Sequence, residues 1–119
     1  MKPNVTTVEA NKMLKTIATK YFGIFEDHFH RIVIEKPLMA LEKYKRERVT
    51  FDTIVVNVCD VVKRTRVGCP PSTWADEQFV NALFCNLKKG GKVLFTSPVI
   101  DDQRVRDYHI SLRIANSII

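Results

Sequence analysis

The sequence predicts an α/β fold, in which a small doubly wound parallel sheet of about four strands has helices on both faces. Segments rich in β-branched residues alternate four times with segments of helical periodicity, and this order is typical of a parallel sheet wrapped by helices. Residues 51–58 have a continuous apolar centre, which predicts a central strand buried on both sides. A length of 119 residues suits a single domain with one core.

The first half of the chain contains two strand and helix pairs. Residues 4–9 and 31–35 are rich in β-branched and apolar side chains, so both are predicted to be strands. Apolar residues recur at helical spacing over residues 13–22, and Gly23 is placed to end that helix in a left-handed turn. A second helix is predicted over residues 37–46, because the first helical turn tolerates its leading proline.

The second half begins with a predicted polar loop over residues 60–71, which ends in two prolines. A helix is expected from Ser72, with Thr73 and Asp76 in the spacing of a helix-capping pair. Gly90 and Gly91 are expected to stop this helix. Residues 92–97 then predict the fourth strand, and a last helix is expected from residue 101 to the end of the chain.

The composition limits the classes of binding partner and the cellular compartment that we expect for this protein. The net charge is +6, but the basic clusters fall in separate loops and helix ends without a series of stacking aromatic residues, so binding to nucleic acid is not favoured. No apolar run is long enough for a membrane helix. Three scattered cysteines suit a reducing compartment, so we expect a cytoplasmic protein. His28 and His30 lack a third ligand, and no metal site is expected.

Several segments resemble the spermidine-synthase-like class I methyltransferases, which use S-adenosylmethionine. The resemblance covers about residues 5–100. Its most specific segments are Val8-Glu9 before Met13-Leu14 and Tyr21-Phe22-Gly23, the strand Phe51-Asp52-Thr53-Ile54-Val55-Val56, and the loop Gly68-Cys69-Pro70-Pro71 before Phe79. The resemblance implies an S-adenosylmethionine cofactor and a Rossmann-like methyltransferase domain.

The resemblance also implies roles for residues that close the strands, where ligands of such sheets bind. Glu9 matches the acidic residue that accepts both ribose hydroxyls of the cofactor, which needs two acceptor oxygens side by side. The adenine contact falls on Lys36, whose ammonium cannot accept a hydrogen bond, so Glu35 would have to replace it. Asn57 stands where relatives have an aspartate at the cofactor and the reacting amine.

Asn57 favours one chemistry over another. An amide cannot act as the base that aminopropyl transfer requires, but its carbonyl can orient an amine for methyl transfer. Cys59 and Asp60 lie just beyond and could assist, or could be ordinary loop residues. Cys69, Pro70, Pro71 and Trp74 border the expected site. They are interpreted either as a substrate loop or as a rigid loop whose indole packs against the sheet.

The glycine-rich cofactor loop and the first strand of such relatives are absent from these 119 residues. We therefore expect residues 1–119 to be a single partial methyltransferase-like domain with an incomplete sheet. The missing strand would lie between residues 5–9 and 51–58, so either these two strands pair directly or another chain fills the gap. Unpaired strand edges could also bring copies of the chain together.

Three functions follow from these expectations. The first is an S-adenosylmethionine-dependent protein N-methyltransferase, weak or inactive alone because the glycine loop is absent, so that whether the chain is an enzyme stays open. The second is a non-catalytic protein-interaction module derived from the same fold, which binds a partner chain. The third, aminopropyl transfer, is disfavoured by Asn57 and by the net charge of +6, which repels a cationic polyamine.

Overall fold

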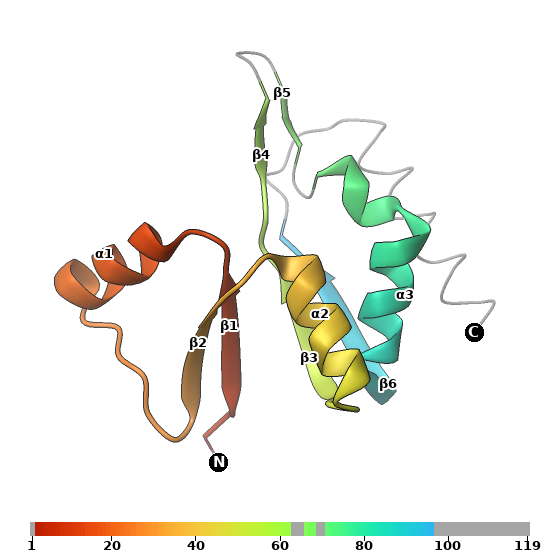
Figure 1. Cartoon of the computed structure of the whole chain (residues 1–119), viewed down its shortest axis with the longest axis horizontal. Coiled ribbons are helices and arrows are strands. Elements are labelled where there is room, and N and C mark those ends of the chain that lie inside the picture. Colours follow the sequence, from red (N-terminus) through yellow and green to blue (C-terminus); the bar gives the residue numbers. More distant parts are fainter. Residues whose placement is uncertain (1, 63–65, 69–70, 97–119) are drawn as a thin grey trace. The chain divides into compact units, whose positions relative to one another are not determined.

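The computed structural model describes residues 2–62, 66–68 and 71–96, with side chains left out for 60–62, 66–68 and 72. The chain divides into an N-terminal unit, Met1–Tyr44, and a C-terminal unit, Lys45–Ile119 (Figure 1). Each unit contains a two-stranded parallel sheet, and an antiparallel hairpin forms a third sheet. The predicted α/β class with parallel pairing is confirmed, but the described strands form two separate parallel pairs instead of one continuous sheet.

In the N-terminal unit, β1 (Val5–Glu9) and β2 (His30–Ile34) pair in parallel, with Val5 opposite His30 and Glu9 opposite Ile34. The helix α1 (Lys12–Phe22) connects them. A parallel pair needs such a crossover connection, because the chain must return to the end of the sheet where it started. The register has no irregularity, as the β-branched composition of both strands favours.

Short polar and glycine signals set the ends of α1. The Asn11 side chain accepts a hydrogen bond from the Met13 N–H at 2.9 Å and so caps the first turn. Gly23 ends the helix with φ 63° and ψ 24°, the left-handed conformation that the sequence predicts for it. The cap at Asn11 was not predicted, although asparagine directly before a helical period is a recognised start signal.

The apolar face of α1 is largely uncovered. No residue from 2 to 39 is buried. The exposed fractions are 63% for Met13, 67% for Tyr21 and 73% for Phe22, so the residues predicted to form the inner face of this helix contribute little buried area.

The helix α2 (Pro37–Arg46) begins with its proline in the first turn, as predicted. It buries Ala40 and Leu41. Beyond its end, Arg48 adopts a φ of 56°, and its N–H donates to the carbonyl of Lys45 at 3.2 Å. A non-glycine residue in this conformation closes the helix and turns the chain towards the next strand.

In the C-terminal unit, β3 (Phe51–Val56) pairs in parallel with β6 (Leu87–Phe95). The 3-10 turn η1 (Ser72–Ala75) precedes the helix α3 (Glu77–Cys85), which runs alongside β6 (Figure 1). Among the described residues of this unit, Val56, Trp74, Ala82 and Leu83 are buried, each at most 5% exposed. These residues come from a strand, the turn and the helix, so the unit has a small core of its own.

The predicted loop over residues 60–71 was wrong in its first part. β4 (Asp60–Val62) and β5 (Arg66–Gly68) form an antiparallel hairpin in which Val61 lies opposite Val67. The charged residues of this segment suggested a loop, but three valines at these positions give both strands a high β propensity.

The predicted helix from Ser72 was wrong at both ends. The first turn is η1, and the chain becomes extended at Asp76 before α3 begins, with no side-chain cap from Asp76. At the other end, the Asn86 N–H bonds to Leu83 and ends the helix before the glycines. Gly90 and Gly91 instead lie within β6, where a Cβ on Gly91 would come 2.9 Å from the carbonyl oxygen of Lys88.

The central position predicted for β3 is not observed among the described residues. β3 pairs with β6 alone, and of its residues only Val56 is buried. β1 and β3 belong to different units, so the expectation that they either pair directly or flank another chain stays a prediction. The helix expected from residue 101 lies outside the described residues.

Candidate functional site

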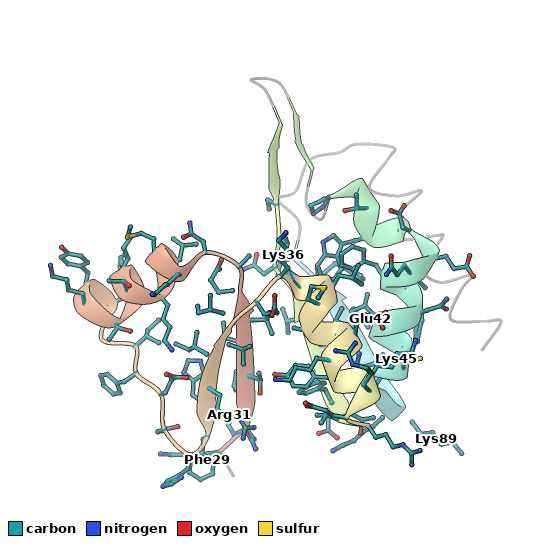
Figure 2. The ribbon with its side chains drawn as sticks, in the orientation of Figure 1. Phe29, Arg31, Lys36, Glu42, Lys45 and Lys89 are labelled. Atoms are coloured by element: carbon teal, nitrogen blue, oxygen red, sulfur yellow. The ribbon has the colours of Figure 1, made fainter. Side chains whose placement is uncertain are left out.

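The carboxyl end of the β1–β2 sheet brings together two of the predicted site residues. Glu9 closes β1 opposite Ile34, and the Glu35 N–H donates to the Glu9 carbonyl at 3.1 Å. Figure 2 shows Lys36 at this end of the sheet, whereas Phe29 and Arg31 lie at the opposite end. Parallel pairing therefore gathers Glu9, Glu35 and Lys36 where ligands of such sheets bind.

Both carboxylates are partly occupied by their own chain. Glu9 Oε1 accepts the Asn11 N–H at 2.7 Å, and Glu35 Oε1 accepts the Lys36 N–H at 2.9 Å. An ionised carboxylate has about four acceptor positions, so each group keeps capacity for a ligand. Glu9 is half-buried and Glu35 is exposed. The chemistry of Glu9 fits a pair of ribose hydroxyls, and its bond to Asn11 also fixes the start of α1.

In the C-terminal unit, Asn57 follows β3 and is held by a residue that sequence analysis missed. The Thr96 hydroxyl donates to Asn57 Oδ1 at 2.6 Å, and the Thr96 N–H donates to the Val56 carbonyl at 3.1 Å. Thr96 follows β6, the parallel neighbour of β3, so both residues close adjacent strands. A hydroxyl residue directly after the last strand was the available signal. The bond uses one of the two lone pairs of the Asn57 carbonyl oxygen.

The proposed substrate loop is only partly described. Trp74 is 5% exposed, and its ring centroid lies 4.4 Å from that of Phe79 at an interplanar angle of 32°. Pro71 is buried as well. The indole therefore packs inside the C-terminal unit against α3, and the substrate-loop and rigid-loop interpretations both stay predictions. Cys69 and Pro70 lie outside the described residues.

The cysteines differ from one another. Cys59 is disulfide-bonded, whereas Cys85 is an exposed free thiol. The interpretation of the cysteines as scattered thiols is therefore wrong for Cys59. Among the described residues, no three histidine, cysteine or acidic side chains gather as a metal site would require.

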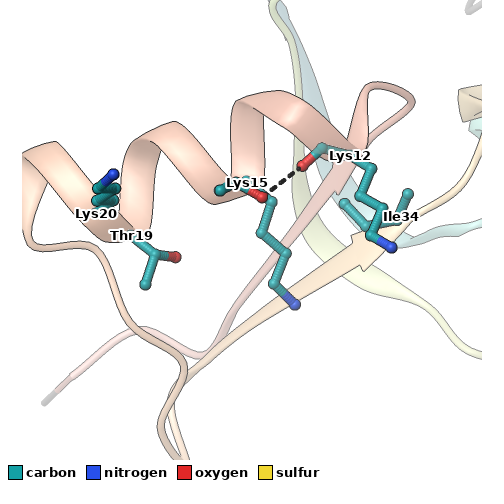
Figure 3. Close-up of a pocket in the computed structure, with 6 residues that line it drawn as sticks. Lys12, Lys15, Thr19, Lys20 and Ile34 are labelled. Atoms are coloured by element: carbon teal, nitrogen blue, oxygen red, sulfur yellow. Dashed lines mark hydrogen bonds between the residues drawn. The ribbon is translucent and has the colours of Figure 1, made fainter.

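A shallow hollow of about 470 Å³ lies beside α1 (Figure 3). Lys12, Lys15, Lys20 and two threonines of the helix line it, together with Ile34 at the end of β2. Glu9 does not line this hollow. Lys15 forms an ion pair with Glu26 at 2.9 Å, and Lys20 lies 5.1 Å from the ring centroid of Tyr21. Lysine side chains thus dominate the lining of this hollow, and none of the predicted cofactor residues lines it.

Glu26 connects this helix to the sheet. Its Oε2 contacts Lys15, and its Oε1 accepts the Ile32 N–H at 2.8 Å. The Ile32 N–H and the Lys15 ammonium together lower the pKa of the Glu26 carboxyl below its ordinary value of 4.5. Both interactions favour the ionised form, so Glu26 stays charged in mildly acidic solution.

The fold agrees with a known structure. No known protein family model and no curated protein matches the chain. The crystal structure of human methyltransferase-like protein 13 in complex with SAH is similar to it, with a TM-score of 0.72 and 20% sequence identity over 92% of this chain. The chain has a methyltransferase-like fold. It spans about half of that structure, 49% of its chain.

The likeness to this structure supports the predicted fold and leaves the finer predictions untested. At 20% identity it establishes the α/β methyltransferase-like fold. The spermidine-synthase-like class, the roles of Glu9, Glu35 and Asn57, and binding of S-adenosylmethionine by this chain stay predictions. Separately, no helix in the described ranges is long and apolar enough to cross a membrane.

Proposed function

We propose that this chain is part of an S-adenosylmethionine-dependent methyltransferase-like protein of the spermidine-synthase-like class that acts on protein amines, and that alone it has little or no activity. The observation that carries the proposal is its likeness to human methyltransferase-like protein 13, whose structure contains SAH. The cofactor would supply the methyl group. A cytoplasmic location belongs to the same proposal.

The residues at the strand ends would have different roles in binding the cofactor and the reacting amine. Glu9 would accept the ribose hydroxyls of the cofactor, because its second oxygen is not engaged by Asn11. Glu35 is the available acceptor for the adenine amino group, since the Lys36 ammonium can only donate. Asn57, held by Thr96, would orient the reacting amine through its remaining lone pair.

The expectation of weak activity rests on the glycines. Gly23 ends α1, Gly68 ends β5, and Gly90 and Gly91 lie in β6. No two of the four glycines have the G-x-G spacing of a loop whose main-chain N–H groups could surround the cofactor. Glu9 would therefore have to bind the cofactor without the loop that usually supplies the close main-chain contact.

Calorimetric titration of the whole chain with S-adenosylmethionine and with S-adenosylhomocysteine tests the proposal. We expect weak binding, with a Kd on the order of 100 μM or above, that Glu9→Ala abolishes. Glu42→Ala, which removes a carboxylate from α2, is the matched control and should leave the Kd unchanged. Micromolar binding that survives Glu9→Ala would refute the role of Glu9, and no binding at millimolar cofactor would refute cofactor binding by this chain.

The alternative is a non-catalytic interaction module derived from the same fold. The absence of any buried residue from 2 to 39 favours it, because exposed apolar side chains of this number are typical of a surface that another chain covers. Transfer of labelled methyl groups to protein amines separates the two candidates. Methyl transfer above background that Asn57→Ala lowers at least tenfold supports the enzyme, and the absence of both transfer and cofactor binding supports the module.

A further inference from the structure

The two outer edges of the β1–β2 sheet differ in how their main-chain groups are satisfied. The Val5 N–H donates to Phe29, and the Glu9 carbonyl accepts from Glu35. Main-chain groups of alternate residues in a parallel strand point to opposite edges. Val5, Thr7 and Glu9 therefore direct their N–H and C=O groups at β2, and Thr6 and Val8 direct theirs at the outer edge of β1.

The outer edge of β2 is protected. The His30 N–H donates to Asp27 Oδ1 at 2.8 Å, and the His30 carbonyl accepts the Asp27 N–H at 3.0 Å. Further along, the Ile32 N–H donates to Glu26 Oε1 at 2.8 Å, and Lys15 holds the other oxygen of Glu26. The segment before β2 thus occupies the outward groups of His30 and the outward N–H of Ile32, which an added strand would otherwise use. Charged side chains at a strand edge are a known protection against further pairing.

The outer edge of β1 has no such protection within residues 2–44. β1 pairs with β2 alone, and no side chain of that range bonds to the outward main-chain groups of Thr6 or Val8. The strand contains no proline, no lysine and no bulge. Its composition, Val-Thr-Thr-Val-Glu, has a high propensity to pair. An edge of this kind recruits another strand.

We propose that β1 pairs with β1 of a second copy of this chain, antiparallel about a twofold axis at Thr7. In this register Thr6 exchanges main-chain hydrogen bonds with the partner's Val8, and Val8 with the partner's Thr6. The dimer joins two β1–β2 sheets into one four-stranded sheet whose remaining edges are the protected edges of β2.

Self-complementarity selects a second copy as the occupant. The twofold register places Glu9 opposite the partner's Val5, so the only charge of the strand never meets a like charge directly across the pair. Thr6 and Val8 form a β-branched cross-strand pair, which is among the favourable combinations. The short edge buries less area than a standard interface, so the Kd is on the order of 100 μM.

Sedimentation equilibrium of the whole chain from about 5 to 500 μM tests the proposal. We expect a monomer and dimer equilibrium that Thr6→Pro weakens at least tenfold, because proline removes an outward N–H and leaves the bonds to β2 intact. Ile34→Pro is the matched control, since it removes an outward N–H from the opposite edge of the sheet and should leave the Kd unchanged. Thr6→Lys, which adds a charge to the edge, should weaken the dimer as well. This second variant keeps the test valid if the proline variant does not fold.

The register has its own signature. In a mixture of isotope-labelled and unlabelled chains, we expect an intermolecular nuclear Overhauser effect between the Thr7 Hα atoms of the two copies, which face each other in an antiparallel pair. A strict monomer at 500 μM would overturn the proposal. So would a dimer that neither Thr6 variant weakens, or one that Ile34→Pro weakens equally. Failure of cofactor binding would leave this result unaffected.

Discussion

The two units of this chain use apolar side chains very differently. Among the residues that the structure describes, thirteen large apolar side chains are exposed and eleven of them belong to residues 5–39, whereas Trp74 and Leu83 of the C-terminal unit are buried. Both units have a helix and a parallel strand pair. The difference is that α3 packs against both η1 and β6, and α1 buries no residue. Apolar content therefore predicts burial only where neighbouring elements supply the opposing surface.

Core truncation should give the largest contrast between the units. Leu83→Ala leaves a cavity at a side chain that is 1% exposed, and should lower the free energy of unfolding of the C-terminal unit by about 3 kcal/mol. Leu14→Ala on α1, where the side chain is 48% exposed, should cost less than about 1 kcal/mol. Urea titration at low protein concentration measures both by circular dichroism. Equal losses would contradict the comparison.

The only tryptophan of the chain makes this experiment unit-specific. Trp74 lies in the C-terminal core, so its fluorescence reports on that unit, while circular dichroism reports on both. We expect Leu83→Ala to lower the urea midpoint of the fluorescence transition and Leu14→Ala to leave it unchanged. A fluorescence midpoint that moves with Leu14→Ala would mean that the units unfold together.

Glycine substitutions should separate two kinds of strain, with the next largest effect. Gly91→Ala places a Cβ 2.9 Å from the Lys88 carbonyl oxygen and 3.1 Å from that of Asp52, and should cost about 2 kcal/mol because main-chain atoms must shift. Gly23→Ala meets no atom within 4 Å but keeps a φ of 63°, and should cost about 1 kcal/mol. Thermal unfolding measures both. A neutral Gly91→Ala would show that β6 can relax.

Removal of the hydroxyl that holds Asn57 should have a smaller effect. Thr96→Val loses the bond to Asn57 Oδ1 and should cost about 1 kcal/mol. The side-chain amide resonances of Asn57 should shift in nuclear magnetic resonance spectra, while those of Asn11, in the other unit, stay in place. Unchanged Asn57 resonances would show that the two side chains do not interact in solution.

Lowering the pH should destabilise the N-terminal unit through Glu26, and this is the smallest of the expected effects. The folded pKa of Glu26 is lowered, so its contribution to stability is fully present above pH 4.5 and is lost as the pH falls through the lower folded pKa. We expect the Ile32 amide to titrate with a midpoint below 4.5 and to exchange faster below it. Glu26→Gln should remove this titration. A midpoint at or above 4.5 would contradict the predicted contacts of Glu26.

Local signals made much of the fold predictable. The β-branched runs predicted β1, β2 and β3, and Gly23 and Pro37 marked helix ends because each residue has a specific conformational preference. The hairpin of β4 and β5 was missed because the charged residues of this segment were interpreted as a loop, although its three valines favour strands. The end of α3 was misplaced because the two glycines serve β6 instead: Gly90 adopts a φ of 78°, and Gly91 lies close to main-chain atoms of Lys88 and Asp52.

The candidate site was predictable only in part. Strand-end position placed Glu9, Glu35 and Asn57 among the candidates, since parallel strands gather their carboxyl ends. The resemblance to methyltransferases assigned their roles, which stay predictions. The partners of these side chains, Asn11 and Thr96, depend on tertiary geometry and were not foreseen. The interior position of Trp74 followed from packing against Phe79, which periodicity does not specify.

The irregular pairing of β3 with β6 also bears on how relatives can differ in length. Two steps along β3, from Phe51 to Thr53, correspond to five along β6, from Leu87 to Lys92. Residues 88–91 are therefore not paired one by one with β3. An insertion or deletion in this segment would change the chain length and leave the register of residues 92–95 intact. Gaps in a comparison with any relative belong at this segment, and a gap placed within residues 92–95 would turn the strand over.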